Sequence, residues 1–141
     1  MPKRKATAAW DGPIKEGKGH LELESGAFSG PYSFSSRFED GSGTNPEELI
    51  AAAHAGCFAM AFSGNLGRAG HAPERIDARA EVHLEKQGDG FGIPRIHLVC
   101  EGKVPGIDEA TFQEVARQSK EGCPVSKVLA GAEITLDAKL V

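Results

Sequence analysis

In the first quarter of the chain, apolar and polar residues alternate. A period of two residues is typical of strands that bury one face. Over residues 5–38 this pattern predicts three short strands, because Gly-rich turns near Gly12 and over residues 26–31 interrupt it. We therefore expect an N-terminal three-stranded sheet. Its last strand is predicted to carry Tyr32, Phe34, Ser36 and Phe38 on one face, and Ser33, Ser35 and Arg37 on the other.

A long helix is predicted next. Asn45 is a good N-cap, Pro46 suits the first helical position, and acidic residues from Glu47 onward favour the positive end of the helix dipole. The helix is expected to run to about Arg68. Residues 51–62 are apolar on nearly every face, so we expect a buried central helix that is enclosed on all sides. A single domain of 141 residues struggles to enclose such a helix, whereas a second subunit would cover it.

The rest of the chain predicts a second sheet with two further helices, and the fold class is α+β with mixed or antiparallel sheets packed on helices. The size fits a single domain over residues 1–141. The expected elements are strands at 79–85 and 95–101, an amphipathic helix from Asp108 to Gly122, a short helix from Pro124 to about Ala130, and a last strand at 133–140.

The net charge and composition of the chain exclude some classes of binding partner. The formal net charge is −4, so the chain lacks the excess of Lys and Arg that binding to nucleic acid requires. A basic segment, residues 1–5, is not followed by the apolar run of a signal peptide, and we identify no membrane span. We expect a cytoplasmic protein that binds neither nucleic acid nor membranes.

Three cysteines offer candidate chemistry, and their odd number points to buried or reactive thiols rather than a disulfide scaffold. Cys123 precedes a helix start, where the dipole favours a thiolate. Cys57 lies in mid-helix, where burial raises the pKa of a thiol, so reactivity there requires a cation. Arg37 is a candidate for that cation, or else a solvated strand residue. Cys100 lies on the apolar face of its strand and is expected to be structural.

One histidine leaves two further functions open. His54 precedes Cys57 by three residues and shares its helix face, so it could serve as a base for the thiol. With Cys57 and Cys123 it could instead form part of a metal site. A third alternative is a small-molecule binding protein that uses the same pocket without turnover.

Several motifs, in order, resemble the osmotically inducible protein OsmC / organic hydroperoxide resistance family. The resemblance spans essentially the whole chain, and the Ser-Arg-Phe-Glu segment is similar to the OsmC branch. The motifs are Ser36-Arg37-Phe38-Glu39, Gly43-Thr44-Asn45-Pro46-Glu47-Glu48-Leu49, Ala52-Ala53-His54-Ala55-Gly56-Cys57-Phe58, Val104-Pro105-Gly106-Ile107-Asp108 and Gly122-Cys123-Pro124-Val125-Ser126.

This resemblance implies a thiol-dependent peroxidase that acts in oxidative or osmotic stress defence. Cys57 would be the peroxidatic cysteine, and Cys123 would resolve its sulfenic acid as a disulfide. Arg37 and Glu47 would form a charged pair that holds Cys57 as thiolate. No cofactor or metal is implied, and an external dithiol, such as a lipoyl protein, would reduce the disulfide.

The family also implies an intertwined homodimer with shared active sites. Glu47 and Cys57 are ten residues apart on one helix, which corresponds to about 15 Å along its axis. If both serve one site, Glu47 must come from the partner subunit, and Arg37 with it. The apolar residues expected around the site suit alkyl or lipid hydroperoxides; they include Phe34, Phe58, Met60 and Phe62.

Overall fold

The computed structural model covers residues 1–141 and divides into two compact units, Met1–Leu49 and Ile50–Val141. The N-terminal unit holds a three-stranded antiparallel sheet, as the alternation predicted. The second unit holds a second three-stranded sheet with helices. Both sheets and the α+β class are thus confirmed. The expectation of a single domain over 1–141 stays a prediction, since the contacts group into these two units.

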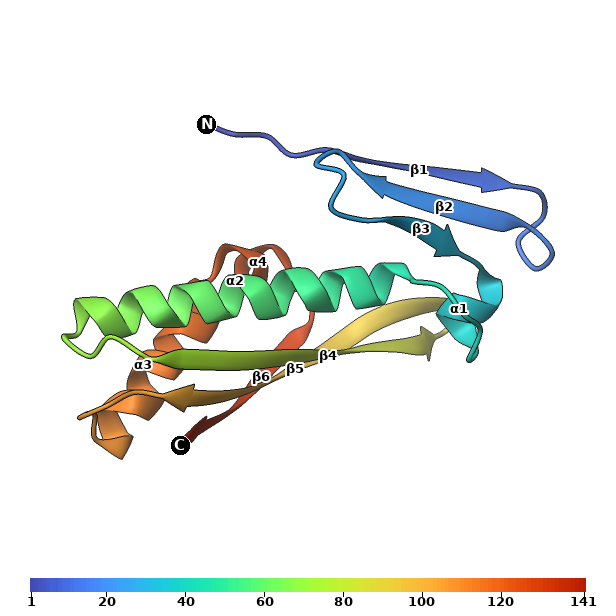
Figure 1. Ribbon diagram of the computed structural model, residues 1–141. Coiled ribbons are helices and arrows are strands. Elements are labelled where there is room, and N and C mark those ends of the chain that lie inside the picture. Colours follow the sequence, from blue (N-terminus) through green and yellow to red (C-terminus); the bar gives the residue numbers. More distant parts are fainter. The chain divides into compact units, whose positions relative to one another are not determined.

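The N-terminal sheet has the order β1-β2-β3 (Figure 1) and little apolar burial. Its strands are β1, Ala6–Asp11, β2, Lys18–Leu23, and β3, Ser29–Tyr32. The rings of Trp10 and Tyr32 approach to 5.4 Å between centroids on this sheet. None of the fully buried hydrophobic side chains of the chain belongs to this unit. The sheet therefore has no deep apolar core of its own.

A short helix, α1, Phe34–Phe38, replaces the continuation of the third strand, so the prediction of a strand at these residues was wrong. Alternation over residues 32–38 matched a strand, but a reciprocal capping box starts a helix instead. The backbone N–H of Ser36 donates to Ser33 Oγ over 3.1 Å, and the N–H of Ser33 donates to Ser36 Oγ over 2.8 Å. Arg37 therefore lies on a helical turn rather than on a strand face.

The long helix α2, Pro46–Arg68, begins and ends where the sequence indicated. Asn45 Oδ1 accepts from the backbone N–H of Glu48 over 2.7 Å, which satisfies one of the free N–H groups of the first turn. Two acidic residues in that turn, Glu47 and Glu48, suit the positive end of the helix. Helical geometry ends before Gly70, whose φ of +89° favours glycine.

The second sheet is mixed and has the order β4-β5-β6 (Figure 1). Strand β4, Arg75–Gln87, is antiparallel to β5, Gly90–Lys103, which is parallel to β6, Glu133–Leu140. The parallel pair needs a crossover, and helices α3, Glu109–Gly122, and α4, Pro124–Val128, supply it.

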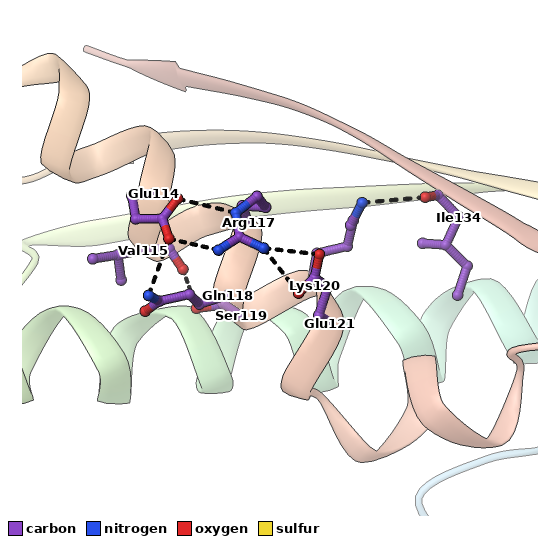
Figure 2. Close-up of polar contacts among 8 residues, drawn as sticks. All are labelled: Glu114, Val115, Arg117, Gln118, Ser119, Lys120, Glu121 and Ile134. Carbon is purple, nitrogen blue, oxygen red and sulfur yellow. Dashed lines mark hydrogen bonds and ion pairs between the residues drawn. The ribbon is translucent and has the colours of Figure 1, made fainter.

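Helices α2 and α3 share a core with the inner face of this sheet. Phe62 of α2 packs against Phe112 of α3 in a tilted arrangement with ring centroids 5.2 Å apart, and neither ring is exposed. The cluster also includes Leu98 of β5. The outward side of α3 is polar: Figure 2 shows Arg117 between Glu114 and Glu121.

Within the second unit, only one face of α2 is covered. His54, Phe58, Phe62 and Leu66 are fully buried, whereas Met60 is 79% exposed. Ala52, Ala53 and Gly56 are exposed as well. The helix was expected to be buried on all sides, but only one side is buried here. Burial of the other side by a second subunit stays a prediction.

Helix α2 is also long and apolar enough to cross a membrane by length and composition alone. The core helix of a soluble protein passes the same test. Phe58, Phe62 and Leu66 place α2 in the core of the second unit, where they pack against the sheet and α3. This packing identifies α2 as a core helix.

Candidate active site around Cys57

Two of the three cysteines meet in the second unit. Cys57 is partly exposed on α2, and Cys123 is fully buried at the junction between α3 and α4. Their side chains hydrogen-bond to each other, and both are free thiols. The fold therefore brings together the two cysteines on which the resemblance placed the chemistry.

The first turn of α4 supports Cys57 rather than Cys123. A backbone hydrogen bond from Val125 reaches the Cys57 sulfur and favours its thiolate form. Cys123 makes no side-chain hydrogen bond to cap α4, and its own N–H donates to the Ser119 carbonyl over 3.1 Å. The dipole argument pointed to Cys123 as the thiol beside this helix start, whereas the Val125 N–H of α4 faces the sulfur of Cys57.

Burial and Cys123 nevertheless make Cys57 a weak acid in the single chain. Burial is the largest cause that raises the pKa of Cys57, and the hydrogen bond and charge of Cys123 raise it further. The Val125 N–H lowers this pKa but does not outweigh those causes. A reactive thiolate at neutral pH thus calls for an additional positive charge.

A charged pair is present in the N-terminal unit. Arg37 Nε donates to Glu47 Oε1 over 2.9 Å and its Nη2 to Oε2 over 3.3 Å, a two-point ion pair. Glu47 is 7% exposed, so its carboxylate lies largely out of water. The guanidinium carbon also lies 5.3 Å from the centre of the Phe38 ring. The structure thus brings Arg37 and Glu47 together, while their role at Cys57 stays a prediction.

Local hydrogen bonds fix α1 against the start of α2 and so hold this pair. Ser36 Oγ donates to the Thr44 carbonyl over 2.7 Å, and Asn45 Nδ2 donates to the Ser36 carbonyl over 2.9 Å. Gly43 makes the connection possible with a φ of +109°, where an added Cβ would meet the Pro31 carbonyl oxygen at 2.8 Å. Buried polar contacts, rather than apolar packing, set the geometry of this turn.

His54 lies one helical turn before Cys57 and faces a hydroxyl. Its Nε2 is 2.7 Å from Ser126 Oγ, the ring is fully buried, and Nδ1 has no hydrogen-bond partner. Burial lowers the pKa of His54, which favours a neutral ring. No group of three or more His, Cys, Asp or Glu side chains converges to hold a metal ion. The donors named for a metal site are therefore not gathered into one.

Cys100 is a core thiol. It is buried on β5 in the cluster with Phe112, and burial raises its pKa to about 11. This position confirms the expectation from the apolar face of its strand.

Sequence reasoning missed two residues beside the thiols, Val125 and Ser126. Both lie in the Gly-Cys-Pro-Val-Ser motif, but neither was assigned a role. Pro124 at the first position of α4 was the available signal, because a helix that starts there points the next N–H groups toward its N-terminal side. Which sulfur they would meet depended on tertiary packing.

Comparisons with known proteins identify relatives of this chain. The family model for OsmC-like proteins matches residues 39–139. The Peroxiredoxin OsmC of Escherichia coli strain K12 is 54% identical over 138 residues, which cover 97% of this chain and 96% of that protein. An organic hydroperoxide resistance protein of Xanthomonas axonopodis pv. citri is 33% identical over 102 residues, or 68% of this chain and 67% of that one.

Solved structures share the fold. The crystal structure of an organic hydroperoxide resistance protein from Elizabethkingia anophelis, with thiocyanate bound, superposes with a TM-score of 0.80. That alignment covers 100% of this chain and 98% of the other at 22% sequence identity, so it speaks for the fold alone. Taken with the family match and the identity to a relative over nearly the full length, these findings show that the chain belongs to the OsmC-like protein family.

Proposed function

We propose that this protein is a thiol-dependent peroxidase that reduces organic hydroperoxides to alcohols. The contact between the side chains of Cys57 and Cys123 carries this proposal, because a sulfenic acid formed on one thiol would meet the other at once. The names of the relatives, peroxiredoxin and organic hydroperoxide resistance protein, point to the same activity.

The reaction requires two steps on the protein and one outside it. The Cys57 thiolate attacks the terminal peroxide oxygen, so an S–O bond forms, the O–O bond breaks, and the departing alkoxide takes a proton to become the alcohol. The sulfur of Cys123 then attacks the Cys57 sulfenic acid; an S–S bond forms, and hydroxide leaves with the thiol proton as water. An external dithiol returns two electrons and two protons, and a lipoyl protein fits this role.

Arg37 supplies the positive charge that Cys57 needs, and Glu47 fixes the direction of the guanidinium. On an α-helix, ten residues correspond to about 15 Å, whereas an ion pair requires about 4 Å between its charged atoms. One chain's Glu47 is therefore too far along the helix from its own Cys57. We assign Glu47 and Arg37 to the partner subunit's thiol in a two-fold dimer.

A second copy of the chain is the partner that suits the uncovered side of α2. This side carries Met60, 79% exposed, among small residues such as Ala53 and Gly56. Small residues let a facing helix approach closely, and burying the apolar surface stabilises the pair. The N-terminal unit, which lacks a deep apolar core, gains cover from the same assembly.

The apolar wall proposed for the substrate needs a correction. Phe58 and Phe62 are fully buried in the core of the second unit, so they do not line an open site. Met60, one helical turn beyond Cys57, and Phe34 remain accessible. These two side chains favour an alkyl or lipid hydroperoxide over hydrogen peroxide.

A peroxidase assay tests the proposal. Reduced protein should consume cumene hydroperoxide steadily with dihydrolipoamide, and more slowly with glutathione. Cys100→Ser is the matched control, because it removes a thiol that is outside the site. No consumption of hydroperoxide with any dithiol would identify a binding protein instead. We place the activity in the cytoplasm, in defence against oxidative or osmotic stress.

A further inference from the structure

A buried hydrogen bond links the two cysteine-bearing helices without involving either sulfur. His54 precedes Cys57 by one turn of α2, and Ser126 follows Cys123 in the first turn of α4. The distance from His54 Nε2 to Ser126 Oγ is 2.7 Å, and both residues are buried. This contact lies beside the thiol pair, so it fixes the separation between the two segments that must form the disulfide.

A second link lies on the other side of the thiols. Asn65 Nδ2 donates to Ser119 Oγ over 2.9 Å. That hydroxyl donates to the Val115 carbonyl over 2.7 Å (Figure 2). Along α2 the order is His54, Cys57, Asn65; along α3 and α4 it is Ser119, Cys123, Ser126. The two series of residues run in opposite directions, and each cysteine lies between the two hydrogen-bonded links.

The state of His54 suits a structural contact better than proton transfer. A buried imidazole has two nitrogens to satisfy, and only Nε2 has a partner. As with backbone groups, an unpaired acceptor is tolerated more often in protein interiors than an unpaired N–H donor. The neutral ring with its proton on Nε2 therefore donates to Ser126 Oγ, and Nδ1 keeps a lone pair.

We propose that His54 is a positioning residue: through Ser126 it holds the Cys123 segment against α2, so that the disulfide closes quickly once Cys57 is oxidised. The idea rests on the proposed two-cysteine peroxidase. Closure requires both sulfurs to lie at bonding geometry, and a misplacement of about 1 Å costs such a step on the order of 100-fold. The peroxide step uses the Cys57 thiolate and the charge proposed for Arg37 but not the sulfur of Cys123, so it depends much less on this link.

The test separates the two steps in a single turnover without reductant. Full-length reduced protein is mixed with one equivalent of cumene hydroperoxide and quenched by alkylation. Loss of hydroperoxide reports the first step, and the Cys57–Cys123 disulfide, measured by peptide mass spectrometry, reports the second. Dimedone added before the quench traps any Cys57 sulfenic acid that waits for closure.

Ser126→Ala is expected to leave the peroxide step within about twofold and to slow closure at least about tenfold. Excess hydroperoxide should then convert Cys57 to sulfinic acid. His54→Leu should behave in the same way. His54→Gln should restore fast closure, because the glutamine amide nitrogen occupies about the position of Nε2 and donates to Ser126.

Two controls separate positioning from loss of stability. Thr135→Ala removes the other histidine–hydroxyl contact of this unit, His97 Nδ1 to Thr135 Oγ1 at 2.6 Å, which joins β5 to β6. Val115→Ala removes buried apolar volume from α3. Both variants should close the disulfide at the wild-type rate, although Val115→Ala lowers the midpoint of unfolding.

Closure at the wild-type rate in folded Ser126→Ala protein would overturn the proposal, as would equal slowing in Val115→Ala. If Ser126→Ala fails to fold, the histidine variants decide: His54→Gln closing as slowly as His54→Leu contradicts the role. A wild-type protein that consumes hydroperoxide and forms no disulfide would reject the resolving role of Cys123 and, with it, this inference.

Discussion

The two units of the chain bury different kinds of side chain. In Ile50–Val141 the fully buried residues are mainly apolar, and Phe62, Leu98 and Phe112 form one core. In Met1–Leu49 the buried side chains are polar or charged, namely Ser36, Thr44 and Glu47. One unit is thus held together by apolar packing, and the other by hydrogen bonds around an ion pair.

This difference separates two parts of the proposed chemistry. The apolar unit fixes the sulfurs of Cys57 and Cys123, and it raises the pKa of Cys57. The polar unit fixes the Arg37 guanidinium on Glu47. A buried charge is stable only when it is paired, so the ion pair belongs in polar surroundings. In the proposed reaction, the nucleophile and the charge that would activate it are therefore built separately, and both are needed.

Removing the nucleophile should give the largest effect. Cys57→Ser is expected to lower peroxidase turnover by at least about 1000-fold, since it removes the proposed nucleophile and the other two thiols are buried. Cys123→Ser should still react once and accumulate Cys57 sulfenic or sulfinic acid. Mass spectrometry after one equivalent of hydroperoxide checks both. Full activity of Cys57→Ser would assign the chemistry elsewhere.

A core truncation measures how unequal the two units are in apolar packing. Phe62→Ala should lower the free energy of unfolding by about 3–5 kcal/mol, because it leaves a cavity in a fully buried cluster. Tyr32→Ala, in the partly exposed N-terminal sheet, should cost clearly less. Urea unfolding at fixed protein concentration gives both values. Equal losses would show that the N-terminal unit has a core of comparable strength.

Removing the cation tests the electrostatic half of the comparison. Arg37→Ala should raise the pKa of Cys57 further, because the thiolate loses its opposite charge. A rise of about one pKa unit reduces the thiolate fraction at neutral pH about tenfold, and the rate falls with it. The pH dependence of alkylation at Cys57 measures the change, with Arg117→Ala on α3 as a control. An unchanged profile would make Arg37 a structural residue only.

The smallest effect is expected at the junction that holds the ion pair. Asn45 caps α2 and also donates to the Ser36 carbonyl of α1. Asn45→Ala should cost about 1 kcal/mol of stability, as loss of an N-cap does. Asn45→Asp keeps the cap but not the donor, so it should retain most of that stability. A cost below measurement error in both variants would show that the junction is held by other contacts.

The sequence predicted features that depend on local signals. Asn45 and Pro46 marked the start of α2, and Asp108 marked α3; its Oδ2 accepts from the N–H of Thr111 over 2.9 Å. The same kind of signal was available at Ser33, where a capping box begins α1. There the alternation of aromatic residues indicated a strand, and local hydrogen bonding overrode it.

Contacts between residues that are distant in the sequence could not be predicted from residue spacing or from hydrophobic periodicity. Nothing local to Cys57 or Cys123 indicates that they touch; the family resemblance alone suggested the pair. From the sequence, His54 was interpreted only as a base or a metal ligand. Its contact with Ser126 could not be predicted, because Ser126 lies 72 positions away in the sequence. The orientation of the Val125 N–H toward Cys57 likewise depends on how α4 packs on α2.

Mixed dimers test most directly whether the nucleophile and its ion pair come from different chains. Inactive Cys57→Ser and inactive Glu47→Ala proteins are unfolded, combined in equal amounts and refolded together. Half of the dimers should then be mixed, and each mixed dimer has one site with an intact Cys57 and an intact Glu47 from its partner. We expect about a quarter of the wild-type activity by this statistical pairing. No recovery, with mixed dimers shown to form, would place the whole site within one chain.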